Sequence, residues 1–250
     1  MKRLLKSAVR PLRIAAGRFV VAAEPPTSSI IHKAAEIVSS EHIEGDYLEF
    51  GVYRGSTFIQ AFHTIHKSYN DRALDRTAVH SPAFRTKVRQ LWDSMRFFAF
   101  DSFQGLPPLT GPDVHTRDFA EGKFACSEKE FLARAGENGV DLSKVVTVPG
   151  WFSDTCLAET IRRHDMRAAA FVHVDCDLYE STRVVLKFIE PLLVDGTVLI
   201  FDDWYSFRGN PALGEQRAFR EWIPGLPHLT FTEFQKEGPW RNSFIVNVRP

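Results

Sequence analysis

Two short acidic segments, each directly after an apolar run, carry the clearest chemistry in this sequence. Residues 175–182 read Asp-Cys-Asp-Leu-Tyr-Glu-Ser-Thr after the run 168–174, and Asp202 and Asp203 follow the run 197–201. Both runs are typical of buried parallel strands, so four carboxylates should gather at the strand ends where open α/β sheets bind ligands. Crowded acids repel one another unless a cation is bound or some are protonated. Oxygen ligands favour Mg²⁺, Ca²⁺ or Mn²⁺ over zinc, so we expect a hard divalent cation such as magnesium.

A glycine-containing turn points to a bound cofactor. Residues 49–56 read Glu-Phe-Gly-Val-Tyr-Arg-Gly-Ser, in which Gly51 permits a tight turn and Gly55 permits close approach of a ligand or helix. Asp101 ends the next expected strand, where a carboxylate can accept both ribose hydroxyls of an adenosine-type ligand. The spacing exceeds the ~20 residues usual for dinucleotide folds. Glu49 could instead cap the strand–helix junction, and Asp101 could form an Asx turn with Ser102.

Hydrophobic periodicity predicts strands alternating with helices. Strands are expected at 47–50, 97–100, 145–148, 168–174 and 197–201, with helices at 30–40, 56–67, 127–135, 154–163, 182–193 and 216–223. Segments 229–234 and 243–248 predict a closing antiparallel pair. The expected fold is therefore α/β, a doubly wound Rossmann-like sheet with a C-terminal antiparallel strand pair. We expect this domain over 30–250, with 69–94 as an inserted loop or helical excursion over the sheet edge.

Composition narrows the class of protein. A chain of 250 residues suits one α/β domain, and a formal net charge of zero argues against a nucleic-acid partner. The three cysteines have no spacing typical of zinc sites or disulfides, which fits a reducing cytoplasm. No apolar run approaches the ~20 residues of a membrane span.

The first 29 residues differ from the rest. Residues 1–23 carry only basic charges among apolar side chains, a pattern compatible with an anionic membrane surface. The same pattern suits a helix that packs on the domain or on a second subunit, as in a homo-oligomer. Basic residues interrupt the apolar stretch, which argues against a cleaved secretion signal.

Four motifs in order resemble the macrocin O-methyltransferase family, over about residues 30–248. They are the segments 47–56, 100–107, 174–182 and 201–204. The family comprises class I S-adenosylmethionine-dependent enzymes that methylate sugar hydroxyls on macrolides and related natural products, so the resemblance implies this cofactor and a small-molecule or glycan acceptor. The first motif is also similar to that of catechol-type O-methyltransferases, but Leu178 stands where those enzymes have a catalytic lysine.

The resemblance also implies site residues. The metal would be held by Asp175, Asp202 and Asp203. The cofactor would lie against Glu49, Gly51, Tyr53, Gly55, Ser56, Asp101, Ser102 and Asp175, with Gly150, Trp151 and Phe152 flanking the adenine.

Methyl transfer needs an acceptor oxygen that is aligned with the sulfonium and partly deprotonated. A metal on the three aspartates would bind neighbouring hydroxyls and lower the pKa of one, which gives Asp175 a catalytic role. A turn-rich segment, 105–113, is expected over the site, and His115 beside it is the first candidate general base. His173 is the second candidate, or a hydrogen-bonded core residue. Trp204, Tyr205 and Trp240 could wall the acceptor pocket or belong to the core.

Two other functions compete with this one. A metal-dependent glycosyltransferase would use Asp175 and Asp177 as its Asp-x-Asp motif. A protein without activity would use the carboxylates as a structural calcium site. The glycine turn and the acid pair at 202–203 would stay unexplained in the first case.

Overall fold

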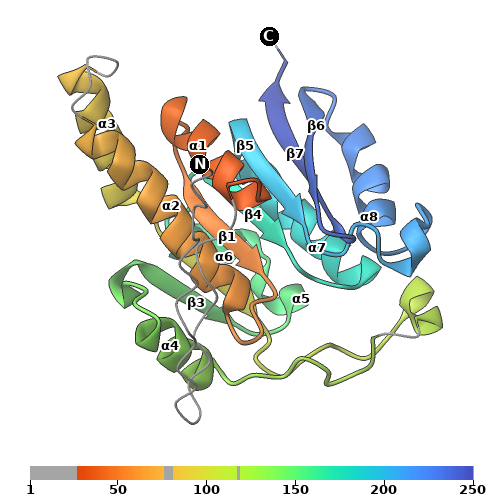
Figure 1. Cartoon of the computed structure of the whole chain (residues 1–250). Coiled ribbons are helices and arrows are strands. Elements are labelled where there is room, and N and C mark those ends of the chain that lie inside the picture. Colours follow the sequence, from red (N-terminus) through yellow and green to blue (C-terminus); the bar gives the residue numbers. More distant parts are fainter. Residues whose placement is uncertain (1–26, 76–80, 117–118, 250) are drawn as a thin grey trace, which may run out of the picture.

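A computed structural model describes residues 27–75, 81–116 and 119–249, so the basic segment 1–23 lies outside the described residues. Seven strands form one sheet in the order β3-β2-β1-β4-β5-β7-β6 (Figure 1). The strands are β1 (Asp46–Phe50), β2 (Phe97–Asp101), β3 (Val145–Pro149), β4 (Ala169–Val174), β5 (Leu193–Phe201), β6 (Leu229–Glu237) and β7 (Arg241–Val248). The first five are parallel, and β7 pairs antiparallel with both β5 and β6. The α/β class and the closing antiparallel pair are confirmed.

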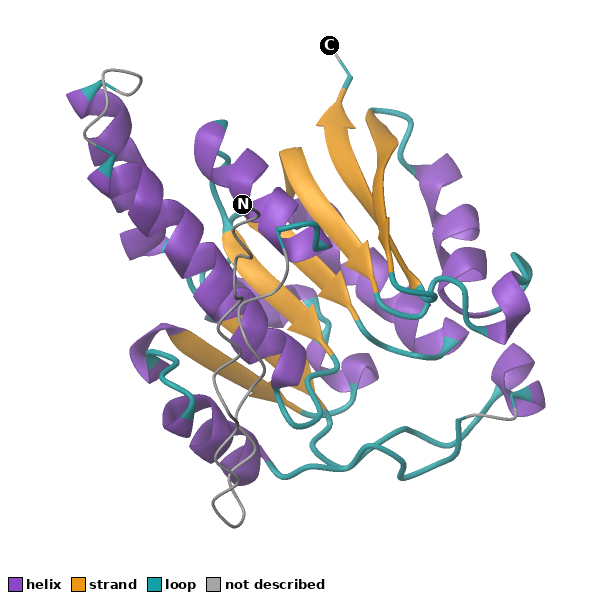
Figure 2. Cartoon of the chain, in the orientation of Figure 1, coloured by secondary structure: helices purple, strands orange, loops and turns teal. Residues whose placement is uncertain are grey.

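Helices cover both faces of the sheet (Figure 2). They are α1 (Ile30–Ser40), α2 (Ser56–Leu74), α3 (Pro82–Ser94), α4 (Glu128–Glu137), α5 (Phe152–Thr155), α6 (Ala158–Arg163), α7 (Tyr179–Ile189) and α8 (Gly214–Trp222). Alternate strand residues point to opposite faces, so two cores form. Tyr47 and Phe97 pack with α1 to α4, whereas Leu48 and Phe98 pack with α5 to α8.

Two expected helices differ in the structure, and the segment 69–94 is helical where it is described. It contributes the end of α2, to Leu74, and all of α3, which borders the amino edge of the sheet. The helix expected at 154–163 is two helices, because Leu157 is extended between them. The helix expected at 182–193 begins earlier, at Tyr179, and β5 begins at Leu193.

Backbone hydrogen bonds align the ends of the parallel strands. The residue that follows a strand donates its backbone amide to a carbonyl near the end of the neighbouring strand, with an N···O distance of 2.9 Å. The donor and acceptor pairs are Gly51 and Phe100, Asp175 and Phe50, Asp202 and Val174, and Gly150 and Asp101. The turns that follow β1, β2, β4 and β5 therefore lie side by side at one edge of the sheet. Among the helices described, none has the length and apolarity to cross a bilayer, and all three cysteines are buried thiols.

Candidate active site

A cavity of about 760 Å³ opens at the carboxyl edge of the sheet, a volume within the usual range for small-molecule sites. Its lining comes from the turns after β1, β2, β3, β4 and β5, from the loop after β2, and from α7. Nine of the expected site residues line it: Gly51, Tyr53, Asp101, Ser102, Trp151, Phe152, Asp175, Asp202 and Asp203. The structure therefore brings the glycine turn and the acidic segments into one cavity.

Asp101 ties the first two turns together. One carboxylate oxygen accepts hydrogen bonds from the amides of Val52 (2.8 Å) and Tyr53 (3.1 Å), and the other accepts from the amide of Phe103 (2.7 Å). Burial raises the pKa of Asp101, and the three amide bonds oppose that rise. Each carboxylate oxygen has two acceptor sites, so Asp101 keeps one site, on the oxygen that accepts from Phe103, for a ligand's hydroxyl.

Four expected cofactor residues lie outside the cavity lining, and three of them have other contacts. Glu49 is fully buried, and its carboxylate accepts hydrogen bonds from the hydroxyls of Tyr47 and Thr57. Gly55 has φ +77°, and a Cβ there would lie 2.9 Å from the ring of Phe131. The absence of a side chain at Gly55 therefore lets α4 pack closely against this turn. A Cβ at Gly150 would lie 2.8 Å from Thr155. Ser56 begins α2 and is exposed.

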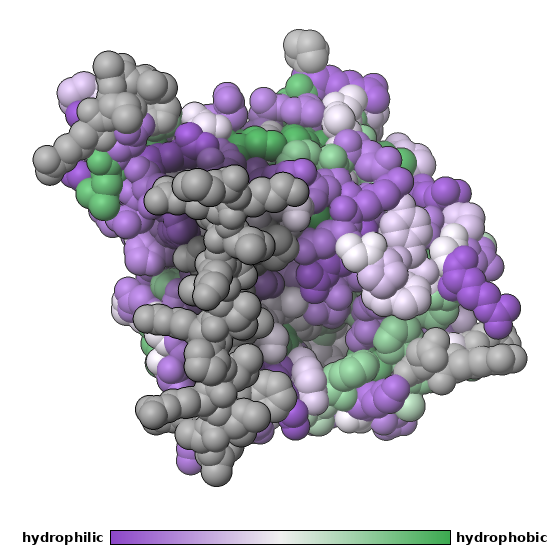
Figure 3. Space-filling model, viewed as in Figure 1, coloured by the Kyte–Doolittle hydropathy of each residue, from purple (hydrophilic) through white to green (hydrophobic). Residues whose placement is uncertain are grey.

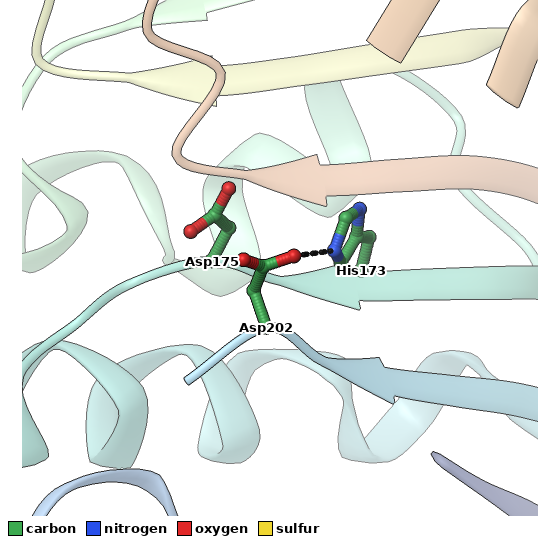
Figure 4. A group of neighbouring side chains, drawn as sticks. All are labelled: His173, Asp175 and Asp202. Carbon is green, nitrogen blue, oxygen red and sulfur yellow. Dashed lines mark hydrogen bonds and ion pairs between the residues drawn. The ribbon is translucent and has the colours of Figure 1, made fainter. Parts of the chain in front are cut away.

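Asp175 is central to the acidic cluster. Its carboxylate lies in two groups whose ligand atoms are all within 4.8 Å of one another, one with His173 and Asp202, the other with Asp177 and Asp203. Asp202 points one oxygen at His173 and holds the second on the side of Asp175 (Figure 4). Of the expected ligands, Asp202 therefore lies in one group and Asp203 in the other, and Asp175 is the residue that the two groups share.

Two cations hold Asp202. Its Oδ1 accepts hydrogen bonds from Nε of Arg241 on β7 (2.5 Å) and from Nε2 of His173 (3.2 Å). Burial alone would raise the pKa of Asp202, but these partners outweigh it and lower the pKa to about 2. His173 has only 6% of its surface exposed. Burial acts to lower its pKa, but its bonds to Asp202 and Glu49 raise it to about 10. Its ring nitrogens face the carboxylates of Asp202 (3.2 Å) and Glu49 (3.7 Å) inside the core, which are the contacts of a buried hydrogen-bonded residue.

The remaining acids carry little compensating positive charge. Burial, followed by repulsion from neighbouring carboxylates, raises the pKa values of Asp175, Asp177 and Glu215. Burial also raises the pKa of Asp203, which accepts a hydrogen bond from Ser206. An oxygen-rich set of this kind suits a hard divalent cation.

Glu215, at the start of α8, is a site residue that the sequence did not reveal. It is 1% exposed, its Oε2 accepts the amide of Asp203 (3.0 Å), and its Oε1 has no hydrogen-bond partner within the described part of the chain. The sequence gives no signal for it, because the contact joins positions 12 residues apart across an irregular loop.

The other candidate residues have mixed outcomes. His115 ends a 3₁₀ helix (Gly111–His115) at the cavity border, and its side chain lies outside what the structure describes. Trp204 is a core residue that packs on Phe219 and Phe244. Tyr205 and Trp240 do not line the cavity either. Its aromatic lining comes instead from Tyr53, Phe119, Phe124, Trp151 and Phe152.

Solved methyltransferase structures share this fold. The O-methyltransferase NovP superposes with a TM-score of 0.61 at 21% identity, covering 88% of this chain and 78% of that one. The calicheamicin methyltransferase CalS11 gives 0.62 at 23% identity, covering 86% and 76%. At these identities the likeness establishes the fold.

Sequence relatives are O-methyltransferases by name, and one of the names includes a rhamnosyl group. A Streptomyces olivaceus 8-demethyl-8-(2,3-dimethoxy-alpha-L-rhamnosyl)-tetracenomycin-C 4'-O-methyltransferase is 29% identical over 68% of this chain and 56% of its own length. Demethyldecarbamoylnovobiocin O-methyltransferase of Streptomyces niveus is 30% identical over 70% and 58%. Mycinamicin III 3''-O-methyltransferase of Micromonospora griseorubida is 30% identical over 70% and 61%. The chain thus spans less than two thirds of the length of these relatives.

The family model of Macrocin-O-methyltransferase (TylF) matches residues 85–221, which is more than half of the chain. This stretch includes Asp101, the two acidic segments and Glu215. The protein therefore belongs to the macrocin O-methyltransferase family.

Proposed function

We propose that this protein is an S-adenosylmethionine-dependent O-methyltransferase that methylates a hydroxyl of a sugar or glycosylated natural product, assisted by a divalent cation. The observation that carries the proposal is the single cavity that joins the glycine turn, Asp101 and the acidic cluster. Family membership supports the same reaction. The proposed location is the cytoplasm. We also propose peripheral membrane contact through residues 1–23 and a homo-oligomeric state.

The cofactor side of the cavity suits an adenosyl sulfonium. Asp101 is placed to accept a ribose hydroxyl on its remaining acceptor site, and Trp151 and Phe152 offer flat apolar surfaces for the adenine. Tyr53 and Gly51 border the space left for the methionine portion. S-adenosylmethionine supplies the methyl group on its positively charged sulfur. Glu49 has a supporting role in this proposal, since it fixes the end of β1 from within the core.

The acceptor side suits hydroxyl chemistry. Asp175, Asp203 and the second oxygen of Asp202 would hold Mg²⁺ or another hard cation, with Asp177 beside them. With a cation held there, two neighbouring hydroxyls of the acceptor would be oriented by it and the pKa of the reacting one would be lowered. The chain's own contribution is to orient the acceptor oxygen and to exclude water from it. His115 stays the proposed general base, supported by the position of its backbone next to Asp113, a cavity residue.

The names of the relatives supply acceptor candidates. All three names describe O-methyltransferases, and they include a rhamnosyl-bearing tetracenomycin and the 3'' position of mycinamicin III. The apolar residues of the cavity, among them Leu106, Pro107 and Phe119, would contact the non-sugar part of such a molecule. We therefore propose a glycoside with an apolar portion as the acceptor class.

Isothermal titration of S-adenosylhomocysteine, with Mg²⁺ and again after chelation, tests this assignment. We expect binding under both conditions, because Asp101 and the glycine turn need no metal. Methyl transfer to a panel of the three named acceptors should stop after chelation. Absence of S-adenosylhomocysteine binding, with UDP-sugars binding only in the presence of Mn²⁺, would favour the glycosyltransferase. Binding without transfer to any acceptor would favour the structural calcium site.

A further inference from the structure

One wall of the cavity is a loop that reaches across the sheet edge. Residues 105–114, here called the strap, follow the turn after β2 and run to the side of α7 (Figures 1 and 2). The strap is pinned at its start by two backbone hydrogen bonds, Leu106 amide to Lys123 carbonyl (2.8 Å) and Gly122 amide to Leu106 carbonyl (2.9 Å). Apolar side chains lie along this part of the surface (Figure 3). The strap residues in the cavity lining are Gly105, Leu106, Pro107, Pro108, Thr110 and Asp113.

Asp113 fastens the far end of the strap to α7. Its Oδ1 accepts the amide of Tyr179 (3.0 Å) and its Oδ2 accepts the amide of Glu180 (3.1 Å). The side chain is 2% exposed. Leu178, the residue just before α7, has no side chain that could cap the helix. The cap is supplied by Asp113 of the strap, 66 positions before Tyr179. A carboxylate at a helix start is also favoured by the helix dipole.

The strap and α7 are in close contact at this point. Gly111 has φ +53°, and a Cβ there would lie 3.1 Å from Oε1 of Glu180. On the cavity side, Leu106 and the two prolines face the space that α7 borders with Glu180, Arg183 and Val184. Apolar residues of the strap and mainly polar residues of α7 therefore line the same cavity, and the Asp113 bonds join the two elements at one end.

We propose that Asp113 is a positioning residue that sets the width of this channel and so selects acceptors with one apolar and one hydroxylated side. The proposal rests on the proposed function. An acceptor of this kind places its apolar part against Leu106 and the prolines, and its hydroxyls against Glu180 and Arg183. Without the Asp113 bonds the strap keeps its anchor at Leu106 but loses the one at α7. The segment between them then moves relative to α7, and the acceptor loses one of its two supports while the cofactor keeps its contacts at Asp101 and Gly51.

Hydrogen exchange on the protein alone tests the fastening, with Asp113→Ala, Asp113→Asn and the control Ser81→Ala. Ser81 also caps a helix, α3, by accepting the amide of Phe84 (3.1 Å), but it lies at the opposite sheet edge. For Asp113→Ala we expect exchange in the strap and at the first amides of α7 to rise by roughly tenfold or more, the effect of losing charge-assisted hydrogen bonds. Asn keeps one acceptor oxygen, so Asp113→Asn should give a smaller rise, and Ser81→Ala none in these segments.

Steady-state kinetics test the selection. In Asp113→Asn we expect KM for the acceptor to rise about tenfold, with kcat and the affinity for S-adenosylhomocysteine each changed by less than about threefold. A merely structural role would lower all three together. Unchanged exchange in the strap overturns the fastening, and unchanged acceptor KM overturns the selection. If wild-type protein fails to bind S-adenosylhomocysteine, the proposed function fails, while the exchange result still decides the fastening.

Discussion

Replacement of Asp101 should weaken the fold and the cofactor site together. Its carboxylate accepts three backbone amides from two turns, and a hydrogen bond to a charged group contributes about 1.5–3 kcal/mol. Burial works in the opposite direction, since it raises the pKa of Asp101 and so makes the charge costly to hold. Part of the three-bond sum is therefore offset, and we expect Asp101→Ala to lose about 2–4 kcal/mol of unfolding free energy.

Asp101→Asn separates the two effects. The amide oxygen can still accept from Val52 and Tyr53, but the amide nitrogen then faces the Phe103 amide as donor against donor. This variant removes the buried charge and should lose about 1–2 kcal/mol of unfolding free energy. For a chain of this size that corresponds to a fall in Tm of roughly 2–8 °C.

Urea unfolding and titration of S-adenosylhomocysteine provide the measurements. The cofactor product should bind about tenfold more weakly to Asp101→Asn, which loses the acceptor site open to ribose, and about a hundredfold more weakly to Asp101→Ala, which also releases the two turns. The control is Asp154→Ala, which removes an exposed acid from α5 outside the cavity lining and should change stability by less than about 0.5 kcal/mol. If Asp101→Ala matches the control in both measurements, the account of Asp101 as the link between turns and cofactor is wrong.

Three further predictions concern the same edge of the sheet. Gly51 has φ +91° and a Cβ there would lie 2.0 Å from the Asp175 carbonyl oxygen, so Gly51→Ala should lose about 3 kcal/mol or more of unfolding free energy in a urea titration; a loss under about 1 kcal/mol would show that the turn can relax. Asp203→Asn should weaken Mg²⁺ binding by tenfold or more in a calorimetric titration while S-adenosylhomocysteine affinity stays within about threefold, and equal metal affinity would remove Asp203 from the ligand set. The folded pKa of His173 is raised from about 6.5 to about 10, so its stabilisation is fully present below pH 6.5 and declines as the pH rises toward 10. Urea unfolding between these pH values should show this decline in the wild type and less of it in His173→Gln, and parallel curves would refute it.

Much of the fold and site was predictable from local sequence. The apolar runs predicted the central strands. The motif residues that directly follow these runs had to lie close together, because parallel strands end at one edge of a sheet. Gly51, Asp101 and Asp175 all line the cavity as expected. The closing pair β6–β7 followed from its alternating pattern.

Contacts between distant segments could not be predicted. Arg241 on β7 reaches Asp202 across 39 positions, and Glu215 lies under Asp203 because of the path of one irregular loop. The start of α7 was misplaced for the same reason, since its cap, Asp113, belongs to the strap. Glu49 illustrates a different difficulty: an acid in a strand was assigned to the cofactor, whereas its bonds to Tyr47 and Thr57 hold it inside the core.

The most direct test of the proposed activity is transfer of a labelled methyl group from S-adenosylmethionine to glycosylated acceptors and to the same molecules without their sugars. We predict label on the glycosylated acceptors, in a Mg²⁺-dependent reaction that Asp175→Asn abolishes and Asp154→Ala leaves unchanged. Label transfer that persists at the wild-type rate in Asp175→Asn after chelation would contradict the role given to the acidic cluster. Absence of transfer to every sugar-bearing acceptor would contradict the proposed activity itself.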